Sequence, residues 1–120
     1  MLVGYPVRQQ AVAMAKGINL PAVFWGRFGE DENICIEIGV YREITIRKAI
    51  SGEKTFSTRE VVRLEKRTKK RKKNNALQFK IQFSDRVWDW LGVDRHISGQ
   101  EIILIFTDQG DSLAVKMERY

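Results

Sequence analysis

The sequence has few of the residues on which several kinds of protein depend. It contains one cysteine, Cys35, so no disulfide can form within the chain. It has no run of about 18 apolar residues, so no membrane-spanning helix is expected. Its first residues, MLVGYPVRQQ, lack the basic region and long apolar core of a secretion signal. Together these absences predict a protein of the cytoplasm, which is a reducing compartment.

The motifs of common catalytic and metal sites are also missing. The chain has no P-loop, G-x-G-x-x-G, H-E-x-x-H or paired C-x-x-C. The single histidine, His96, has Asp94 close by, but a lone histidine in a polar segment is more often a surface residue. Asp108 and Asp111 flank a glycine in an expected hairpin turn, where carboxylates serve the turn itself. We therefore expect no enzyme, no metal site and no cofactor.

What the chain does contain is one pattern that occurs twice. Ile18–Lys48 and Ile81–Lys116 each begin with a short strand, INLP or IQFS, and each reaches a glycine eleven residues later, Gly29 or Gly92. An aliphatic strand, a polar turn and a closing strand follow in each copy, ICIEI with ITIRK and EIILIF with LAVKM. A unit of roughly 50 residues is marginal alone because it buries too little surface. The two copies should therefore share one core with a pseudo-twofold axis, a symmetry that suits twofold targets such as duplex DNA.

Local signals place the elements of each copy. In the first copy, we expect a hairpin in 5–20 with its turn at 15–17, a short helix over 22–28, and strands at 34–38 and 44–47. In the second copy, we expect a helix over 85–91, strands at 101–106 and 113–117, and a hairpin turn at 107–111. The fold class is mainly β with short helices. The first unit spans 1–50, a linker 51–60, and the second unit 61–120, all around one shared barrel core.

Positive charge is concentrated between the two copies. Residues 63–73 read RLEKRTKKRKK, which is eight basic residues and one acidic residue, whereas the whole chain has a net charge of +6. The rest of the chain is therefore close to neutral. The segment 57–60, STRE, fits a capping box and allows a helix running into Lys73. The repeat instead favours a strand over 61–68, a turn at 72–75 and a returning strand over 77–83.

The ordered spacing of the repeat resembles the AbrB/MazE/SpoVT family of swapped-hairpin DNA-binding domains. The residues that carry the resemblance are Ile18-Asn19-Leu20-Pro21, Gly29 and the two strands after it, followed by their second occurrence from Ile81. The resemblance implies a swapped-hairpin β-barrel, built here from two tandem units of one chain rather than from two chains. It also implies a role as a transcriptional regulator or as the antitoxin of a toxin–antitoxin pair, with DNA bound through basic residues of the N-terminal hairpins.

The sequence therefore predicts a small transcriptional regulator that binds double-stranded DNA. Clustered lysine and arginine side chains bind DNA by releasing condensed counterions, and arginine and asparagine can also read base edges. A homodimer is possible. The expected DNA-binding residues are Arg8, Lys16, Lys66, Arg67, Lys69, Lys70, Arg71, Lys72, Lys73, Asn74, Asn75 and Lys80.

Two other functions stay open at this point. The protein could be an interaction module, such as an antitoxin or a small inhibitor of a protein partner. It could also bind single-stranded nucleic acid if its tryptophans stack on bases. Trp25 and Trp88 occupy corresponding places in the two copies, which favours packing in the core, whereas Trp90 is out of phase with Trp88 and is expected to be partly exposed.

Overall fold

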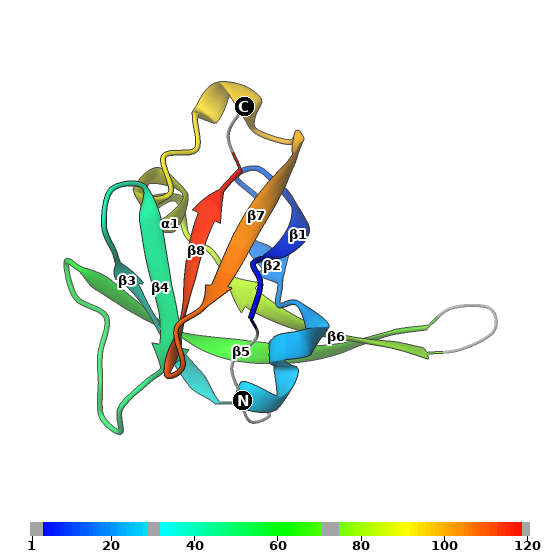
Figure 1. The fold of residues 1–120 in the computed structure, drawn as a ribbon, viewed down its shortest axis with the longest axis vertical. Helices are drawn as coiled ribbons and strands as arrows, with labels where there is room; N and C mark the ends of the chain where they lie inside the picture. The colour runs from blue at the N-terminus through cyan, green and yellow to red at the C-terminus, as the bar shows by residue number, and fades with distance from the viewer. Residues whose placement is uncertain (1–3, 29–31, 71–74, 119–120) are drawn as a thin grey trace.

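Eight antiparallel strands form one sheet that curls into a nearly closed barrel (Figure 1). The computed structural model describes residues 4–28, 32–70 and 75–118. Its strands are β1 (Val7–Val12), β2 (Gly17–Asn19), β3 (Asn33–Ile38), β4 (Glu43–Lys48), β5 (Arg59–Lys70), β6 (Asn75–Gln82), β7 (Glu101–Asp108) and β8 (Ser112–Met117). Around the barrel they follow the order β1-β7-β8-β4-β3-β5-β6-β2. In the described part of the chain, no helix is both long enough and apolar enough to cross a bilayer.

The strand order confirms the predicted pseudo-twofold barrel. When each strand of the first copy is exchanged with its counterpart four strands later, every strand pair except β5–β6 becomes another pair of the same sheet. The axis passes through two strand pairs that join the copies, β4–β8 at Thr45 and Ala114, and β2–β6 at Ile18 and Ile81. The hairpins are swapped, because β1 pairs with β7 of the second copy and β5 pairs with β3 of the first. Neither copy therefore completes a sheet by itself.

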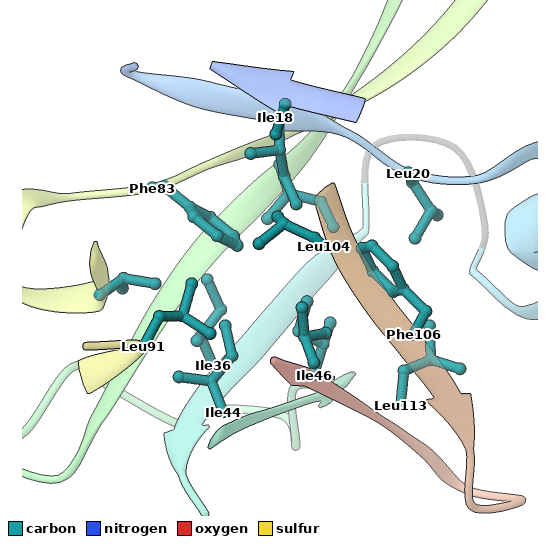
Figure 2. Packing of buried hydrophobic residues seen from close by; sticks show 14 of the residues in the cluster. Ile18, Leu20, Ile36, Ile44, Ile46, Phe83, Leu91, Leu104, Phe106 and Leu113 are labelled. Atoms are coloured by element: carbon teal, nitrogen blue, oxygen red, sulfur yellow. The ribbon is translucent and has the colours of Figure 1, made fainter. Parts of the chain in front are cut away.

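The core lies inside the barrel and follows the two-residue period of its strands. Ile36 and Leu104 are fully buried, as are Ile44 and Ile46 of β4. Figure 2 shows these side chains converging with Phe106 and residues from both copies. A core assembled from both halves of the chain explains how two units too small for independent cores give one stable barrel.

Short helices cover the two ends of this core. The 3-10 helix η1 (Ala22–Arg27) follows Pro21 and buries Phe24, whose ring lies 6.1 Å from that of Phe106. The helix α1 (Asp85–Trp90) buries Val87 and Trp88, and the adjacent Leu91 packs near Ile36 and Ile44 (Figure 2). A further 3-10 turn, η2 (Arg95–Ile97), lies in the insertion before β7.

The residues that begin and end these helices differ between the copies. Pro21 offers no side-chain cap, whereas the Ser84 hydroxyl caps α1 by accepting the Val87 amide at 3.3 Å. Gly92 follows α1 with φ of 75°, a left-handed conformation that glycine adopts at little cost. Gly29, the expected end of the first helix, lies outside the described residues.

Two of the three tryptophans pack in the structure, as expected. Trp88 is fully buried and donates its indole N–H to the Ala15 carbonyl at 2.7 Å. Trp25 is partly buried and donates to the Leu20 carbonyl, also at 2.7 Å. Trp90 is partly exposed, as expected, and the Arg86 guanidinium lies 4.8 Å from its ring centre.

Several local predictions needed correction. The turn of the first hairpin lies at Ala13-Met14 rather than at 15–17, because Met14 itself takes positive φ (63°) and the Ala15 amide bonds to the Val12 carbonyl at 3.2 Å. By contrast, the favoured strand over 61–68 is confirmed, and the alternative helix from the capping box is not formed, since 59–70 is strand β5. The last turn is shorter than expected, because β7 continues to Asp108.

Candidate nucleic-acid interface

The β5–β6 hairpin extends beyond the barrel as a two-stranded ribbon (Figure 1). The β5 strand pairs with β3 only as far as Arg63, and β6 pairs with β2 only from Lys80 onward. Between these points β5 and β6 pair with each other alone, in a register that runs from Leu64 opposite Ile81 to Lys70 opposite Asn75. We call this projecting part, Glu65–Lys70 with Asn75–Phe79, the basic arm.

The basic arm carries most of the predicted DNA-binding residues that the structure describes. Lys66 and Arg67 are exposed on β5. Lys69 and Lys70 continue the same strand and pair with Ala76 and Asn75. Lys80 lies at the base of the arm, opposite Glu65, and is partly exposed. Arg71, Lys72, Lys73 and Asn74 lie outside the described residues.

One acidic side chain tempers the charge of the arm. Glu65 accepts hydrogen bonds from Arg67 at 2.7 and 3.0 Å, and both side chains are about half exposed to solvent. An ion pair in this setting contributes little to stability and exchanges its partners readily. Arg67 can therefore turn from Glu65 to a phosphate or a base without a large loss of folding free energy.

Both strands that carry the arm are fixed to the barrel. On β6, the Phe79 ring is buried and lies 4.9 Å from the Trp25 ring in an edge-on contact. On β5, the buried Glu60 carboxylate accepts hydrogen bonds from the Ser84 hydroxyl at 2.6 Å and from Arg86 at 2.8 Å. These contacts join the barrel part of β5 to α1 and its cap, and the base of the arm on β6 to η1, which gives the ribbon a defined direction.

Two predicted DNA-binding residues lie away from the arm. Arg8 is on the outer side of β1 and donates to the Glu118 carboxylate at 2.6 Å. Lys16 is exposed in the first hairpin, beside a hollow that Glu60 and Asp85 also line. Among the described residues, the structure therefore brings together predicted DNA-binding residues of the second hairpin only, and the first hairpin presents no comparable group of basic side chains.

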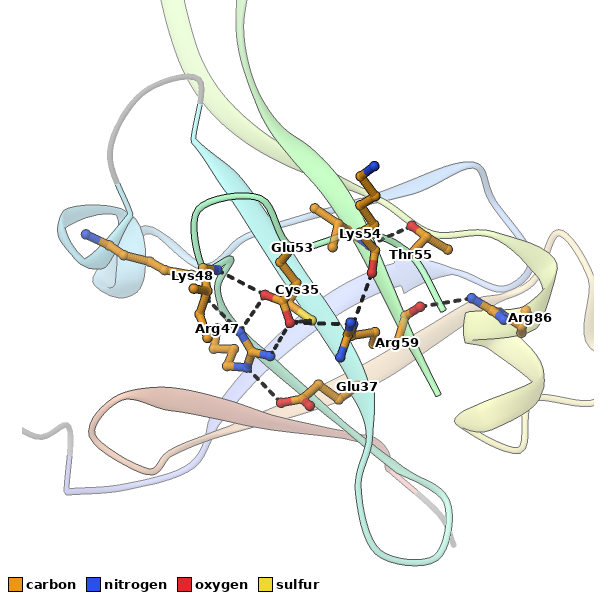
Figure 3. Close-up of polar contacts among 11 residues, drawn as sticks. Cys35, Glu37, Arg47, Lys48, Glu53, Lys54, Thr55, Arg59 and Arg86 are labelled. Atoms are coloured by element: carbon orange, nitrogen blue, oxygen red, sulfur yellow. Dashed lines mark hydrogen bonds and ion pairs between the residues drawn. The ribbon is translucent and has the colours of Figure 1, made fainter. Parts of the chain in front are cut away.

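A polar network that joins β3, β4 and the linker after β4 was not predicted from the sequence. The linker after β4 folds back so that the Glu53 carboxylate accepts from Arg47 at 2.7 and 2.9 Å and from the Ile50 amide at 3.0 Å (Figure 3). The hydrogen bonds from Arg47 are the main cause that lowers the pKa of Glu53 to about 2. Arg47 also donates to Glu37 at 2.8 Å.

This network explains why Cys35 is buried, although the two-residue alternation of ICIEI predicts that Cys35 and Glu37 lie on an exposed face. Its thiol lies under the linker, 3.7 Å from the Glu53 carboxylate. Desolvation is the largest cause that raises the pKa of Cys35 to about 11. The thiol is therefore protonated at neutral pH, which is the less reactive form of a cysteine.

Other candidate sites hold side chains that already have partners. A hollow of about 580 Å³ is lined by Arg27, Arg47 and Lys48, but Arg47 is bonded to the two glutamates above and Arg27 bonds to Asp108 and to the Gly110 carbonyl. His96 is exposed and lies 2.7 Å from Asp94, which raises its pKa. Among the described residues, no group of three metal-ligating side chains comes together.

Comparison with known proteins found no relative of this chain. No family model, no curated protein and no solved structure matches this chain.

Proposed function

We propose that this protein binds double-stranded DNA through the basic arm, as a small transcriptional regulator. The observation that carries the proposal is the shape of the arm together with its charge. The major groove of B-DNA admits a two-stranded β-ribbon. The arm is such a ribbon, it projects clear of the barrel, and four of the six residues in 65–70 are basic.

Counterion release supplies the free energy of this binding. Each phosphate that a lysine or arginine neutralises frees condensed cations, so affinity depends strongly on salt. The interleaved hairpins of the barrel also support the proposed membership in the AbrB/MazE/SpoVT family, whose members place basic hairpins on DNA. The single-strand alternative has less support, because Trp88 is buried, Trp25 packs on Phe79 and Arg86 covers Trp90.

The test compares two triple variants over a salt series. The arm variant is Lys66→Gln, Lys69→Gln and Lys70→Gln. The matched control replaces three exposed lysines elsewhere, Lys48→Gln, Lys54→Gln and Lys116→Gln. Both lose the same charge. Both should keep the circular dichroism spectrum of the parent, because Lys66 and the three control lysines are exposed and because Lys69 and Lys70 belong to the ribbon beyond the barrel.

Affinity for a random 20-base-pair duplex is measured by fluorescence anisotropy at several salt concentrations. The log–log slope should flatten by about 0.9 for each phosphate contact that the arm variant loses, and the control should change it much less. Equal changes in both variants would place the contact elsewhere on the protein. A parent affinity weaker than about 10⁻⁴ M at physiological salt, the weak limit of non-specific binding, would end the proposal.

A further inference from the structure

The pseudo-twofold symmetry of the strand pairing is broken at one place, the junction between β1 and β2. Their counterparts β5 and β6 form a continuous ladder. By contrast, β1 and β2 stand at the two ends of the strand order and are not hydrogen-bonded neighbours. They are joined at their turn by the bond from the Ala15 amide to the Val12 carbonyl and diverge beyond it. The barrel is therefore open along this seam, which we define as the gap between β1 and β2.

The backbone groups that face the seam can be assigned from their neighbours. The Val12 carbonyl points away from β7, because it accepts from Ala15. Alternation along an antiparallel strand then turns the N–H and C=O of Gln10 toward the seam as well. On β2, the Lys16 carbonyl and the Leu20 amide bond to β6, so the intervening Gly17 and Asn19 turn their backbone groups toward the seam.

A hollow of about 360 Å³ follows the seam, lined by Gln9, Gln10, Asn19, Lys80 and Glu101 among others. The side-chain oxygen Oδ1 of Asn19 is buried and has no hydrogen-bond partner among the described residues. A buried acceptor without a partner costs free energy, roughly 1–3 kcal/mol in the general case. A ligand that donates to this oxygen would recover that cost.

We propose that the seam binds an extended peptide segment of a partner protein, which adds as a strand to the free edge of β1 and places an acidic side chain near Lys80. Only another extended backbone carries N–H and C=O groups at the spacing that a free strand edge presents. Lys80 is the basic side chain that lines the diverging end of the seam, whereas Glu101 lies opposite Val12 at the closed end. An acid on the peptide therefore belongs beside Lys80.

Two other occupants fit less well. A DNA duplex has no backbone donors to pair with a strand edge. The basic arm of a second copy is extended, but it would bring lysines against Lys80. This inference does not rest on the proposed DNA binding, because the peptide-binding edge is on β1 and the basic arm is on β5 and β6; Lys80, at the base of the arm, is the one residue named in both.

The probe is a display library of random twelve-residue peptides, selected on the folded full-length protein. The selected sequence is then synthesised in its parent form and in two forms N-methylated at alternate residues. If the peptide adds as a strand, methylation of the amides that face β1 should weaken binding at least tenfold, and methylation of the other set should change it by less than threefold. In this comparison the protein is unchanged, so its folding does not affect the result.

Two variants locate the site. Gln10→Pro removes an N–H that faces the seam, at an edge position where proline is tolerated, and should weaken binding at least tenfold. Lys80→Gln should weaken an acidic peptide severalfold, whereas the arm variant Lys66→Gln, Lys69→Gln and Lys70→Gln should leave its affinity within twofold of the parent value. Amide hydrogen exchange should show new protection at Gln10.

Each contrary result would overturn the inference. These results are failure to enrich any peptide, equal effects of the two methylation sets, or unchanged exchange at Gln10 in the complex. Concentration-dependent self-association that Gln10→Pro abolishes would assign the seam to a second copy instead.

Discussion

Glu53 is the side chain on which the polar contacts of the linker converge. Its carboxylate accepts hydrogen bonds from Arg47 and from the Ile50 amide. The Nε atom of Arg59, at the start of β5, lies 3.6 Å from the same carboxylate (Figure 3). The carboxylate therefore ties the linker to β4 and to the start of β5. Because only the charged form accepts all of these bonds, its contribution to stability depends on pH.

Glu53→Gln should destabilise the protein at pH 7 and lose this effect in acid. The folded-state pKa of Glu53 is lowered from 4.5 to about 2, so the carboxylate stabilises the fold fully above pH 4.5. That stabilisation is lost as the pH falls toward 2. Urea unfolding of parent and variant at pH 7, 4 and 3 measures the difference. Glu65→Gln is the control, since its half-exposed pair with Arg67 should contribute little at any of these values. An equal, pH-independent loss in both variants would contradict this account.

A second prediction at the scale of residues concerns the stability that buried aliphatic side chains contribute. Ile36 and Leu104 are both fully buried, each in the middle strand of its copy. Truncation to alanine should cost about 2–5 kcal/mol at either position, from lost burial and a residual cavity. Val40→Ala, in an exposed turn, is the control and should cost a few tenths at most. Equilibrium urea unfolding gives all three values, and a small loss at both core positions would show that their packing is not as described.

Single residues could be predicted from the sequence where a local rule acts and not where distant chain segments meet. The burial of Ile36 and Leu104 followed from alternation along a strand. Asp108 was expected to serve its own turn, and it does bond to the Gly110 amide at 2.9 Å. It also pairs with Arg27, which lies 81 positions earlier. A contact across that separation leaves no local pattern in the sequence.

At the scale of elements, the close pairing of β2 with β6 depends on a glycine. A Cβ atom at Gly17 would lie 3.0 Å from the Ile81 carbonyl oxygen, which belongs to the β6 backbone and cannot move aside alone. Gly26, in η1, has no atom within 4 Å of its Cβ position. The two glycines thus differ in the space around them, and the difference makes a matched pair of substitutions.

Gly17→Ala should destabilise the protein by about 1–3 kcal/mol, the usual cost of overpacking. Gly26→Ala should be neutral or stabilising by up to about 1 kcal/mol, because alanine restricts the unfolded chain and meets nothing in the fold. Thermal unfolding of both variants under the same conditions tests the contrast. Equal effects of the two substitutions would mean that β2 and β6 do not approach as closely as described.

The element order was predictable, and the geometry at the hairpins was not. The repeated strand–helix–strand pattern predicted every strand, because alternation and turn residues are local. The divergence of β1 from β2 was missed, because a turn signal near 15–17 predicts a hairpin with paired strands, and no local pattern shows that each strand takes a partner from the other copy instead. The difference arises from what each hairpin contacts: β5 continues from its pairing with β3 into a long ladder with β6, whereas the three residues of β2 pair with β6 alone.

At the scale of the whole molecule, the barrel is a complex of two half-chains joined by a linker. The pairs β4–β8, β2–β6, β1–β7 and β3–β5 all connect one copy to the other. Only β3–β4, β5–β6 and β7–β8 form within a copy. The strand pairing that closes the sheet therefore depends on both copies being present, not on their covalent connection.

This arrangement predicts that the protein can be divided in the linker. Fragments 1–54 and 55–120 should each be largely unfolded alone. The first fragment lacks the partner of β1 and one partner of β4, and the second lacks one partner each of β5 and β8. Mixed at equal concentrations, they should form a one-to-one complex with the β-sheet spectrum of the intact chain, because every inter-copy pair can form again. Circular dichroism and analytical ultracentrifugation of the fragments and their mixture measure this. The complex should weaken strongly when one fragment carries Ile36→Ala, since its core comes from both copies. A fragment that folded cooperatively alone would show that each copy has its own core and that the shared barrel is not the unit of stability.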